Sequence, residues 1–109
     1  MKVAIVGSRG LIIDNFKEYL PENTDEIISG GAKGIDMCAA QYAQKNGILL
    51  TEIKPDYSKY KKSAPIVRNK EIVKFADLIL IFWDGKSKGT KFVIDECIRT
   101  AKPYILHTI

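Results

Sequence analysis

The segment SGGAKGID, residues 29–36, combines residue types that are suited to binding an anion. Glycine permits left-handed backbone and leaves no Cβ in the way, so successive N–H groups can converge on one negatively charged group. The helix expected to follow the segment adds partial positive charge at its amino end. The segment therefore predicts phosphate binding, and a plain tight turn is the alternative interpretation.

The serine, the glycines and the aspartate of this segment each have a candidate role. Gly30 and Gly31 would form the turn, and Gly34 would allow a close backbone approach. Ser29 can add a hydroxyl group. Asp36 would lie in the first helical turn, where it could bind a ribose hydroxyl or cap backbone amides.

Two common nucleotide motifs are excluded by glycine spacing. The glycines follow the order GGxxG rather than GxGxxG, and no acidic residue ends the strand that precedes them. The sequence GKS at 85–87 is not a P-loop, because Leu80 occupies the position that would need glycine. We therefore expect neither a bound dinucleotide cofactor nor an ATPase-type site.

The elements that must position these residues alternate along the chain. Apolar runs predict five strands, and spacing typical of amphipathic helices predicts four helices between them. Continuous apolar strands are typical of a sheet covered on both faces. We predict one α/β domain over residues 1–109, a three-layer Rossmann-like sandwich whose parallel five-stranded sheet has helices on both faces. The predicted strands span 3–6, 26–28, 48–53, 78–83 and 104–107, and the predicted helices span 12–20, 34–46, 66–75 and 90–100, with a polar loop at 54–65.

Three glycine-containing segments follow predicted strands. They are residues 7–9, 29–34 and 84–89. Open parallel sheets bind ligands outside the carboxyl ends of their strands, near the point where strand order reverses. We therefore expect one ligand site at that edge.

Composition narrows the class of protein. Hydrophobic residues make up 46% of the 109 and the net charge is +4, but no stretch approaches the length of a membrane span. We expect a cytoplasmic protein with no membrane partner, in which Cys38 and Cys97 are buried thiols. His107 is the only histidine and there is no CxxC motif, so we expect no metal site.

Four motifs, in this order, resemble the YspA/YpsA-related branch of the SLOG superfamily. They read IVGSRG, ISGGAKGID, APIVRNKEIV and ADLILIFWDGKSKGTKFVID. The superfamily is Rossmann-like and binds nucleotides or nucleotide-derived ligands. Its relatives include DNA-processing protein A and the Lonely Guy phosphoribohydrolases. The resemblance implies ligand contacts from the first loop, the second loop, an Arg–Asn pair on the third crossover helix, and a phosphate-binding fourth loop. These positions are Gly7, Ser8 and Arg9; Gly30, Gly31, Gly34 and Asp36; Arg68 and Asn69; and Asp84, Gly85, Ser87, Gly89 and Thr90.

One departure separates this chain from the phosphoribohydrolases. Those enzymes carry a catalytic glutamate a few residues after the Gly–Thr pair, whereas here the first acid after Thr90 is Asp95. Asp84 and Asp95 are the acids nearest the predicted pocket, so they are the candidate catalytic carboxylates.

The side chains themselves support anion binding. Arg9 and Arg68 can each direct two donors at one phosphate, unless they form surface salt bridges instead. Thr90 could contact a ligand or serve as a helix N-cap. Tyr57 or Tyr60 could stack on a base, and lysines of the 54–65 loop could screen a phosphate.

Three functions remain open at this stage. The first is the binding of a nucleotide-derived, phosphate-bearing small molecule by a sensor or ligand-processing module. The second is hydrolysis of the N-glycosidic bond of a nucleoside monophosphate. The third is single-stranded nucleic-acid binding, which the small net charge and the absence of an aromatic–basic platform do not favour. A small sheet also leaves edges that a homodimer or higher homo-oligomer could cover.

Overall fold

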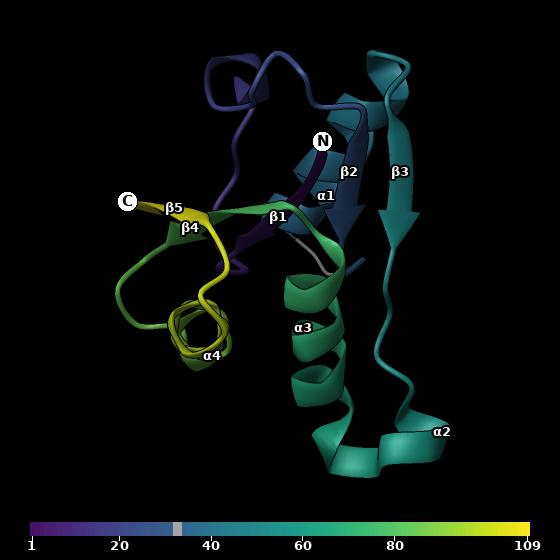
Figure 1. Cartoon of the computed structure of the whole chain (residues 1–109), viewed down its shortest axis with the longest axis vertical. Coiled ribbons are helices and arrows are strands. Elements are labelled where there is room, and N and C mark those ends of the chain that lie inside the picture. Colours follow the sequence, from purple (N-terminus) through teal and green to yellow (C-terminus); the bar gives the residue numbers. More distant parts are fainter. Residues whose placement is uncertain (32–33) are drawn as a thin grey trace.

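The computed structural model describes residues 1–31 and 34–109, and Ala32 and Lys33 of the second glycine loop lie outside the described residues. Five parallel strands form one sheet in the order β3-β2-β1-β4-β5 (Figure 1). The strands are β1 (Lys2–Gly7), β2 (Glu26–Ser29), β3 (Leu49–Glu52), β4 (Leu78–Trp83) and β5 (Tyr104–Thr108). The α-helices are α1 (Ile35–Lys45), α2 (Tyr57–Tyr60), α3 (Ala64–Phe75) and α4 (Lys88–Thr100), with 3-10 turns η1 (Phe16–Glu18) and η2 (Lys61–Ser63).

Helices cover both faces of the sheet, and each face has its own apolar core. On one face, Ile72 of α3 and Val93 of α4 pack with strand residues that include Ile79. On the other, Phe16 of η1 and Ala39 of α1 belong to the second core. This confirms the predicted three-layer α/β architecture.

The alternating direction of side chains explains the uninterrupted apolar run of β4. Ile79 and Ile81 belong to the core under α3 and α4, whereas Leu80 and Phe82 belong to the core under α1. All four are fully buried. A strand that is covered on both faces has no position left for a polar side chain.

The predicted helix over 12–20 is wrong. Only Phe16–Glu18 is helical, as the short turn η1. Ile12, which the spacing placed on the apolar face, is 79% exposed, whereas Phe16 is fully buried and Ile13 and Leu20 pack partly buried against the same core. The segment between β1 and η1 instead follows an irregular path on which the carbonyl group of Arg9 packs against Gly34.

The predicted loop over 54–65 is also wrong in part. It contains α2 and η2, and α3 begins within it at Ala64. Asp56 caps α2, because its carboxylate accepts hydrogen bonds from the backbone N–H of Lys59 at 3.2 Å and the hydroxyl of Ser58 at 2.6 Å. A capped turn therefore begins this segment, which Figure 1 shows at the amino end of α3 and away from the strands.

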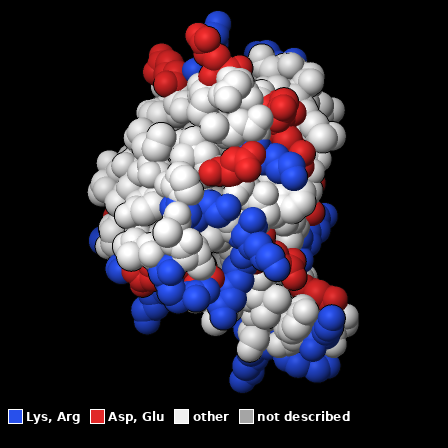
Figure 2. Space-filling view, viewed as in Figure 1, with Lys and Arg blue, Asp and Glu red and all other residues white. Residues whose placement is uncertain are grey.

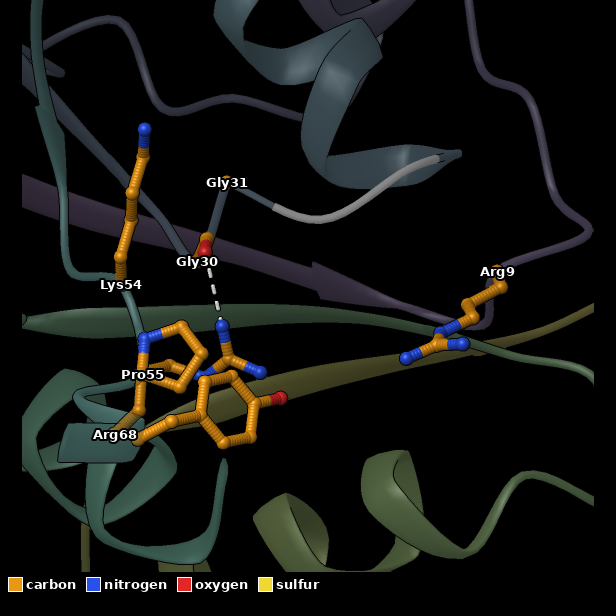
Figure 3. A pocket seen from close by; sticks show the side chains of 7 residues that line it. Arg9, Gly30, Gly31, Lys54, Pro55 and Arg68 are labelled. Carbon is orange, nitrogen blue, oxygen red and sulfur yellow. Dashed lines mark hydrogen bonds between the residues drawn. The ribbon is translucent and has the colours of Figure 1, made fainter. Parts of the chain in front are cut away.

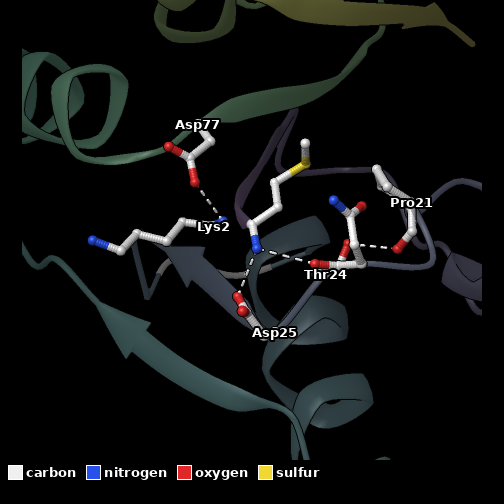
Figure 4. A network of polar contacts seen from close by, with 7 residues as sticks. Lys2, Pro21, Thr24, Asp25 and Asp77 are labelled. Atoms are coloured by element: carbon white, nitrogen blue, oxygen red, sulfur yellow. Dashed lines mark hydrogen bonds and ion pairs between the residues drawn. The ribbon is translucent and has the colours of Figure 1, made fainter.

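Polar contacts fix the start of β1 at the amino edge of the sheet (Figure 4). The Met1 ammonium group donates to Asp25 Oδ1 at 2.9 Å, and the Lys2 N–H donates to Asp77 Oδ2 at 2.8 Å. The hydrogen bond from this ammonium group, together with its charge, lowers the pKa of Asp25. These contacts tie β1 to the turns that precede β2 and β4.

The two cysteines belong to opposite layers. Cys97, on α4, is fully buried, and this burial raises the pKa of its thiol to about 11. Cys38 lies on α1, on the other face of the sheet, and is half-buried. The prediction of a buried thiol is therefore only partly correct for this residue. Within the described ranges, none of the helices has the length and apolar character that a membrane span requires.

Candidate functional site

The strand order reverses between β1 and β4, and this switch point lies where two cavities adjoin. The larger, about 530 Å³, is lined by Arg9, Gly30 and Arg68 together with residues that follow β3. The smaller, about 170 Å³, shares these three residues and extends to the amino end of α4. The loops after β1, β2 and β4 thus meet around two arginines, as the parallel topology predicts.

Most of the sequence-predicted site residues line one of these two cavities. Those that do are Gly7, Arg9, Gly30, Gly31, Asp36, Arg68, Asn69, Ser87, Gly89 and Thr90. Those that line neither are Ser8, Ser29, Gly34, Asp84, Gly85 and Asp95. Three of the latter, Ser8, Ser29 and Asp84, hydrogen-bond within or between the loops.

Arg68 connects α3 to the loop after β2. Its Nη1 donates to the carbonyl oxygen of Gly30 at 2.9 Å, and its Nε donates to Asn69 Oδ1 at 2.8 Å. Figure 3 shows the Arg68 guanidinium group next to Gly30, with the hydrogen bond to the Gly30 carbonyl oxygen as a dashed line. Since a guanidinium group has five N–H donors, these two contacts orient Arg68 and leave other donors for a ligand.

The side chains of Arg68 and Asp36 occupy the space into which a Cβ at Gly30 would project. A Cβ built there would lie 2.5 Å from Arg68 Nη1 and 3.1 Å from Asp36 Oδ2. Asp36, in the first turn of α1, is only 9% exposed. A cationic and an acidic side chain therefore converge on the bare backbone of Gly30, at the junction of the two cavities.

Arg9 is the exposed arginine of the site. Its guanidinium group has no hydrogen-bond or ion-pair partner among residues 1–31 and 34–109. It stands at one side of the larger cavity, well separated from Lys54 on the other (Figure 3). An unpaired guanidinium group at a cavity wall can take up a phosphate without first breaking a salt bridge.

Ser29 and Gly34 hold the second loop in place. The Ser29 Oγ accepts from the Gly31 N–H at 3.2 Å and donates to the Asp36 carbonyl at 3.4 Å. Gly34 has a φ of 78°, and a Cβ there would overlap the carbonyl oxygen of Arg9. Backbone contact between the first two loops therefore requires glycine at this position.

Asp84 folds the fourth loop. Its Oδ1 accepts from the N–H groups of Lys86 and Ser87, both at 2.9 Å, and its own N–H donates to Ser8 Oγ at 3.2 Å. The backbone hydrogen bonds from Ser87 and Lys86 lower the pKa of Asp84. Its carboxylate is thus engaged within the loop that carries it.

Ser87, and not Thr90, is the N-cap of α4. Its Oγ accepts from the Thr90 N–H at 3.5 Å and from the Thr90 hydroxyl at 3.3 Å. The Trp83 indole donates to the Ser87 carbonyl at 3.0 Å, so this aromatic side chain supports the loop. Thr90 is 3% exposed and faces the smaller cavity.

Asp95 does not reach the site. It lies on the exposed face of α4, where its carboxylate pairs with the ammonium group of Lys91. The next acid, Glu96, accepts two hydrogen bonds from the guanidinium group of Arg99. The spacing after Thr90 therefore places neither carboxylate in the smaller cavity, and the expectation for Asp95 has no structural support.

Sequence reasoning named Tyr57 and the lysines of the 54–65 loop as possible ligand contacts but did not select Pro55 or Pro65, which also line the cavities. Lys54, Pro55 and Tyr57 complete the larger one, and Pro65, at the start of α3, lines the smaller one. The unusual length of the predicted loop over 54–65 was the sequence signal that pointed to the segment carrying Lys54, Pro55 and Tyr57. Between the two candidate aromatic residues, the structure distinguishes Tyr57, because Tyr60 instead packs under the Lys59 ammonium group, 5.2 Å from its ring centroid.

The site lies beside a basic part of the surface. Figure 2 shows Lys and Arg side chains gathered over α2, α3 and α4, while acidic side chains are more frequent toward the opposite end of this view. Such a field raises the local concentration of anions. Among the described residues, no group of three His, Cys, Asp or Glu side chains is placed to hold a metal ion.

Residues 1–60 match the family YAcAr, the YspA, cpYpsA-related SLOG family. The matched range includes the loops after β1 and β2 and ends within α2; Arg68, Asn69 and the fourth loop lie beyond it. Among curated proteins and among solved structures, no significant match was found.

Proposed function

Because the chain belongs to the YspA, cpYpsA-related SLOG family, and because its cavities meet at two arginines, we propose that it binds a nucleotide-derived, phosphate-bearing ligand. The ligand lies at the carboxyl edge of the sheet. The chain acts there as a sensor or as a ligand-processing module. The family supports the ligand class, and the geometry of the described residues supports the place.

The observation that carries this proposal is that Arg9, Gly30 and Arg68 line both cavities, with the two arginines on different sides of the shared space. These three residues come from three segments that are far apart in the sequence. Guanidinium groups bind phosphate through charge-assisted, bidentate hydrogen bonds. A phosphate between them gains two cations and the polar groups of the smaller cavity.

The smaller cavity supplies groups that suit a sugar. Asp36, Asn69 and Thr90 line it, and each carries an oxygen that can accept a hydrogen bond from a hydroxyl group. The amino end of α4 also opens into it through Ser87 and Gly89. A phosphorylated ribose therefore matches the donors and acceptors of this compartment.

The hydrolytic alternative gains no support from the two candidate catalytic acids. Asp84 is engaged by the amides of its own loop, and Asp95 pairs with Lys91 on the outer face of α4. General acid or base catalysis needs a carboxyl group within hydrogen-bond reach of the reacting atoms. The described geometry therefore supports ligand binding and offers no support for catalysis by Asp84 or Asp95.

A thermal-shift panel of nucleotides tests this proposal. A nucleotide at 100 times its dissociation constant should stabilise the protein by about 2.7 kcal/mol. We expect Arg9→Gln to abolish this stabilisation, because it removes a charged wall of both cavities. Lys17→Gln makes the same change in charge on η1, away from the cavities, and should retain the full shift.

Calorimetry on the most stabilising nucleotide distinguishes the outcomes. Loss of binding in Arg9→Gln with retention in Lys17→Gln supports the proposal. Equal affinities in both variants, or no stabilisation by any nucleotide, would contradict it. Chromatography of the same mixtures detects released base, which would restore the hydrolytic alternative.

A further inference from the structure

β5 forms one edge of the sheet and is paired with a strand on one side only. The strand order ends in β4-β5, and Figure 1 shows β5 at the end of the sheet opposite β3. The Ile79 N–H donates to the Pro103 carbonyl oxygen at 3.1 Å, and the Ile109 N–H donates to the Trp83 carbonyl oxygen at 2.9 Å. A parallel strand bonds to one neighbour through every second residue. The residues of β5 whose N–H and C=O groups point away from β4 are therefore Tyr104, Leu106 and Thr108.

The two edges of the sheet differ in how they are protected. Natural sheets prevent further strand pairing with short edge strands and charged side chains. β3 has four residues and ends at the exposed Glu52, with the exposed Lys54 close behind. β5 has five residues, and no Lys, Arg, Asp or Glu occurs from Pro103 to Ile109. β5 is therefore the edge that is open to another strand.

Aliphatic side chains of β5 lie outside both apolar cores. The His107 ring stacks on Phe82, which belongs to the core under α1, so Leu106 points to the α4 side of the sheet. Within the described part of the chain, neither Ile105 nor Leu106 belongs to a core, and both are exposed, as is Ile109. Single exposed aliphatic residues are normal, but three within five positions form a patch.

The neighbouring helix extends this patch. α3 packs against β1 and α4, and a cavity between the two helices is lined by Lys70 of α3 and by Glu96 and Thr100 of α4. A helix turns by about 100° per residue, so Ile98 lies on the side of α4 that faces away from α3, toward β5. Its side chain is more than half exposed. The β5 patch consists of Ile98, Ile105, Leu106 and Ile109.

We propose that β5 pairs with β5 of a second copy of this chain, antiparallel and about a twofold axis. Two five-stranded sheets then become one continuous sheet. Leu106 lies opposite its own counterpart, and Tyr104 lies opposite Thr108 of the second copy. The outward N–H and C=O groups of the two edges meet in hydrogen-bonded pairs. The two Ile98 side chains flank this joint on the α4 side.

Charge explains why the occupant is a second copy. The chain carries a net charge of +4, and Figure 2 shows Lys and Arg side chains gathered over α2, α3 and α4. Two copies repel each other unless they meet where such charge is absent or balanced. The β5 strand is uncharged, and Lys91 and Asp95, on the same side of α4 as Ile98, pair with each other. Pairing of β5 with β3 of another copy would instead bring Glu52 into the joint and would not close.

The size of the joint predicts a weak dimer. Five residues of strand extend over about 17 Å. Such a strip, with Ile98 on its flank, buries less than the roughly 800 Å² per partner of a standard interface. We therefore expect a dissociation constant in the micromolar range. Sedimentation velocity from about 5 to about 500 µM protein should show a shift from one chain to twice its mass of 12.2 kDa.

Three lysine substitutions locate the interface. Leu106→Lys places two like charges opposite each other across the twofold axis, so the dissociation constant should rise at least about tenfold. Ile98→Lys changes only the surface of α4 and should raise it at least about threefold, without altering the strand. Leu49→Lys, at an exposed position of β3, is the matched control and should leave it unchanged. Circular dichroism checks that the variants fold.

An oxidative cross-link tests the register. Hydrogen-bonded partners in antiparallel strands have Cα atoms about 5.5 Å apart, a separation that a disulfide can span. In a Cys38→Ser background, Leu106→Cys should form a covalent dimer when diamide is added as the oxidant. Leu49→Cys in the same background should remain a single chain.

Four outcomes overturn the proposal. One is a single-chain mass at every concentration. Another is a dimer that persists in both Leu106→Lys and Ile98→Lys, because it then uses another surface. The third is equal weakening by Leu49→Lys, and the fourth is growth beyond the dimer as concentration rises, which indicates open pairing of β5 with β3. None of these measurements needs a nucleotide, so the proposed function stands or falls separately.

Discussion

Arg68 on α3 donates a hydrogen bond to the carbonyl oxygen of Gly30, 2.9 Å away and 38 positions earlier in the chain. This contact brings the third crossover connection against the loop after β2. It also places a guanidinium group at the junction of the two cavities. The proposed site depends on this relationship more than on any single glycine loop.

Substitution Gly30→Ala should disrupt binding without unfolding the protein. The added Cβ would lie 2.5 Å from Arg68 Nη1, which is the end of a flexible side chain and can move away. We expect at least a tenfold loss of nucleotide affinity and a change of less than about 1 kcal/mol in unfolding free energy. Calorimetry and urea denaturation measure the two effects. Gly10→Ala, where an added Cβ meets no atom within 4 Å, is the matched control. Unchanged affinity in Gly30→Ala would show that the position of Arg68 is not required.

Substitution Gly34→Ala should destabilise the fold itself. The added Cβ would overlap the backbone carbonyl of Arg9, and φ is 78°. Backbone strain and the clash together should cost about 3 kcal/mol or more. Gly47→Ala has a similar φ of 66° but open space, so it should cost only about 1–2 kcal/mol. Urea unfolding of both variants gives the comparison, and equal losses would argue against close packing of the first two loops.

The carboxyl group of Asp84 should titrate below its ordinary pKa of 3.8. Hydrogen bonds from the amides of Ser87 and Lys86 favour its charged form. The stability that it contributes is therefore fully present above pH 3.8 and is lost as the pH falls through the lower folded-state pKa. The destabilisation caused by Asp84→Ala should be constant from pH 7 to about pH 4 and should shrink below that. Carboxyl-carbon NMR gives the pKa directly, and a midpoint at or above 3.8 would be inconsistent with the observed loop.

The apolar strands made the fold predictable from the sequence. The predicted strand over 78–83 coincides with β4, because a continuous apolar run between two covering layers has no competing assignment. The segment 12–20 was assigned incorrectly, since its apolar spacing resembles a helix although Ile12 points to solvent. Periodicity reports which residues could share a face, but tertiary contacts decide whether they do.

The location of the candidate site was also predictable, but the directions of its side chains were not. Parallel strands place their carboxyl ends at one edge, so the three glycine-containing loops were expected to meet. The sequence could not show that Ser8 and Asp84 bond to each other across two loops while Arg9 stays exposed. Nor could it show that Tyr57 lines a cavity while Tyr60 packs under a lysine.

Amide NMR during a nucleotide titration tests the central claim most directly. The claim is that a phosphate-bearing ligand binds at the carboxyl edge, between the loops after β1, β2 and β4. We expect the largest chemical-shift changes at the backbone amides of Arg9, Gly30 and Thr90, with little change at Asp25 and Asp77 on the amino edge. Changes confined to the outer surface of α3 and α4, or no changes at saturating nucleotide, would contradict the account.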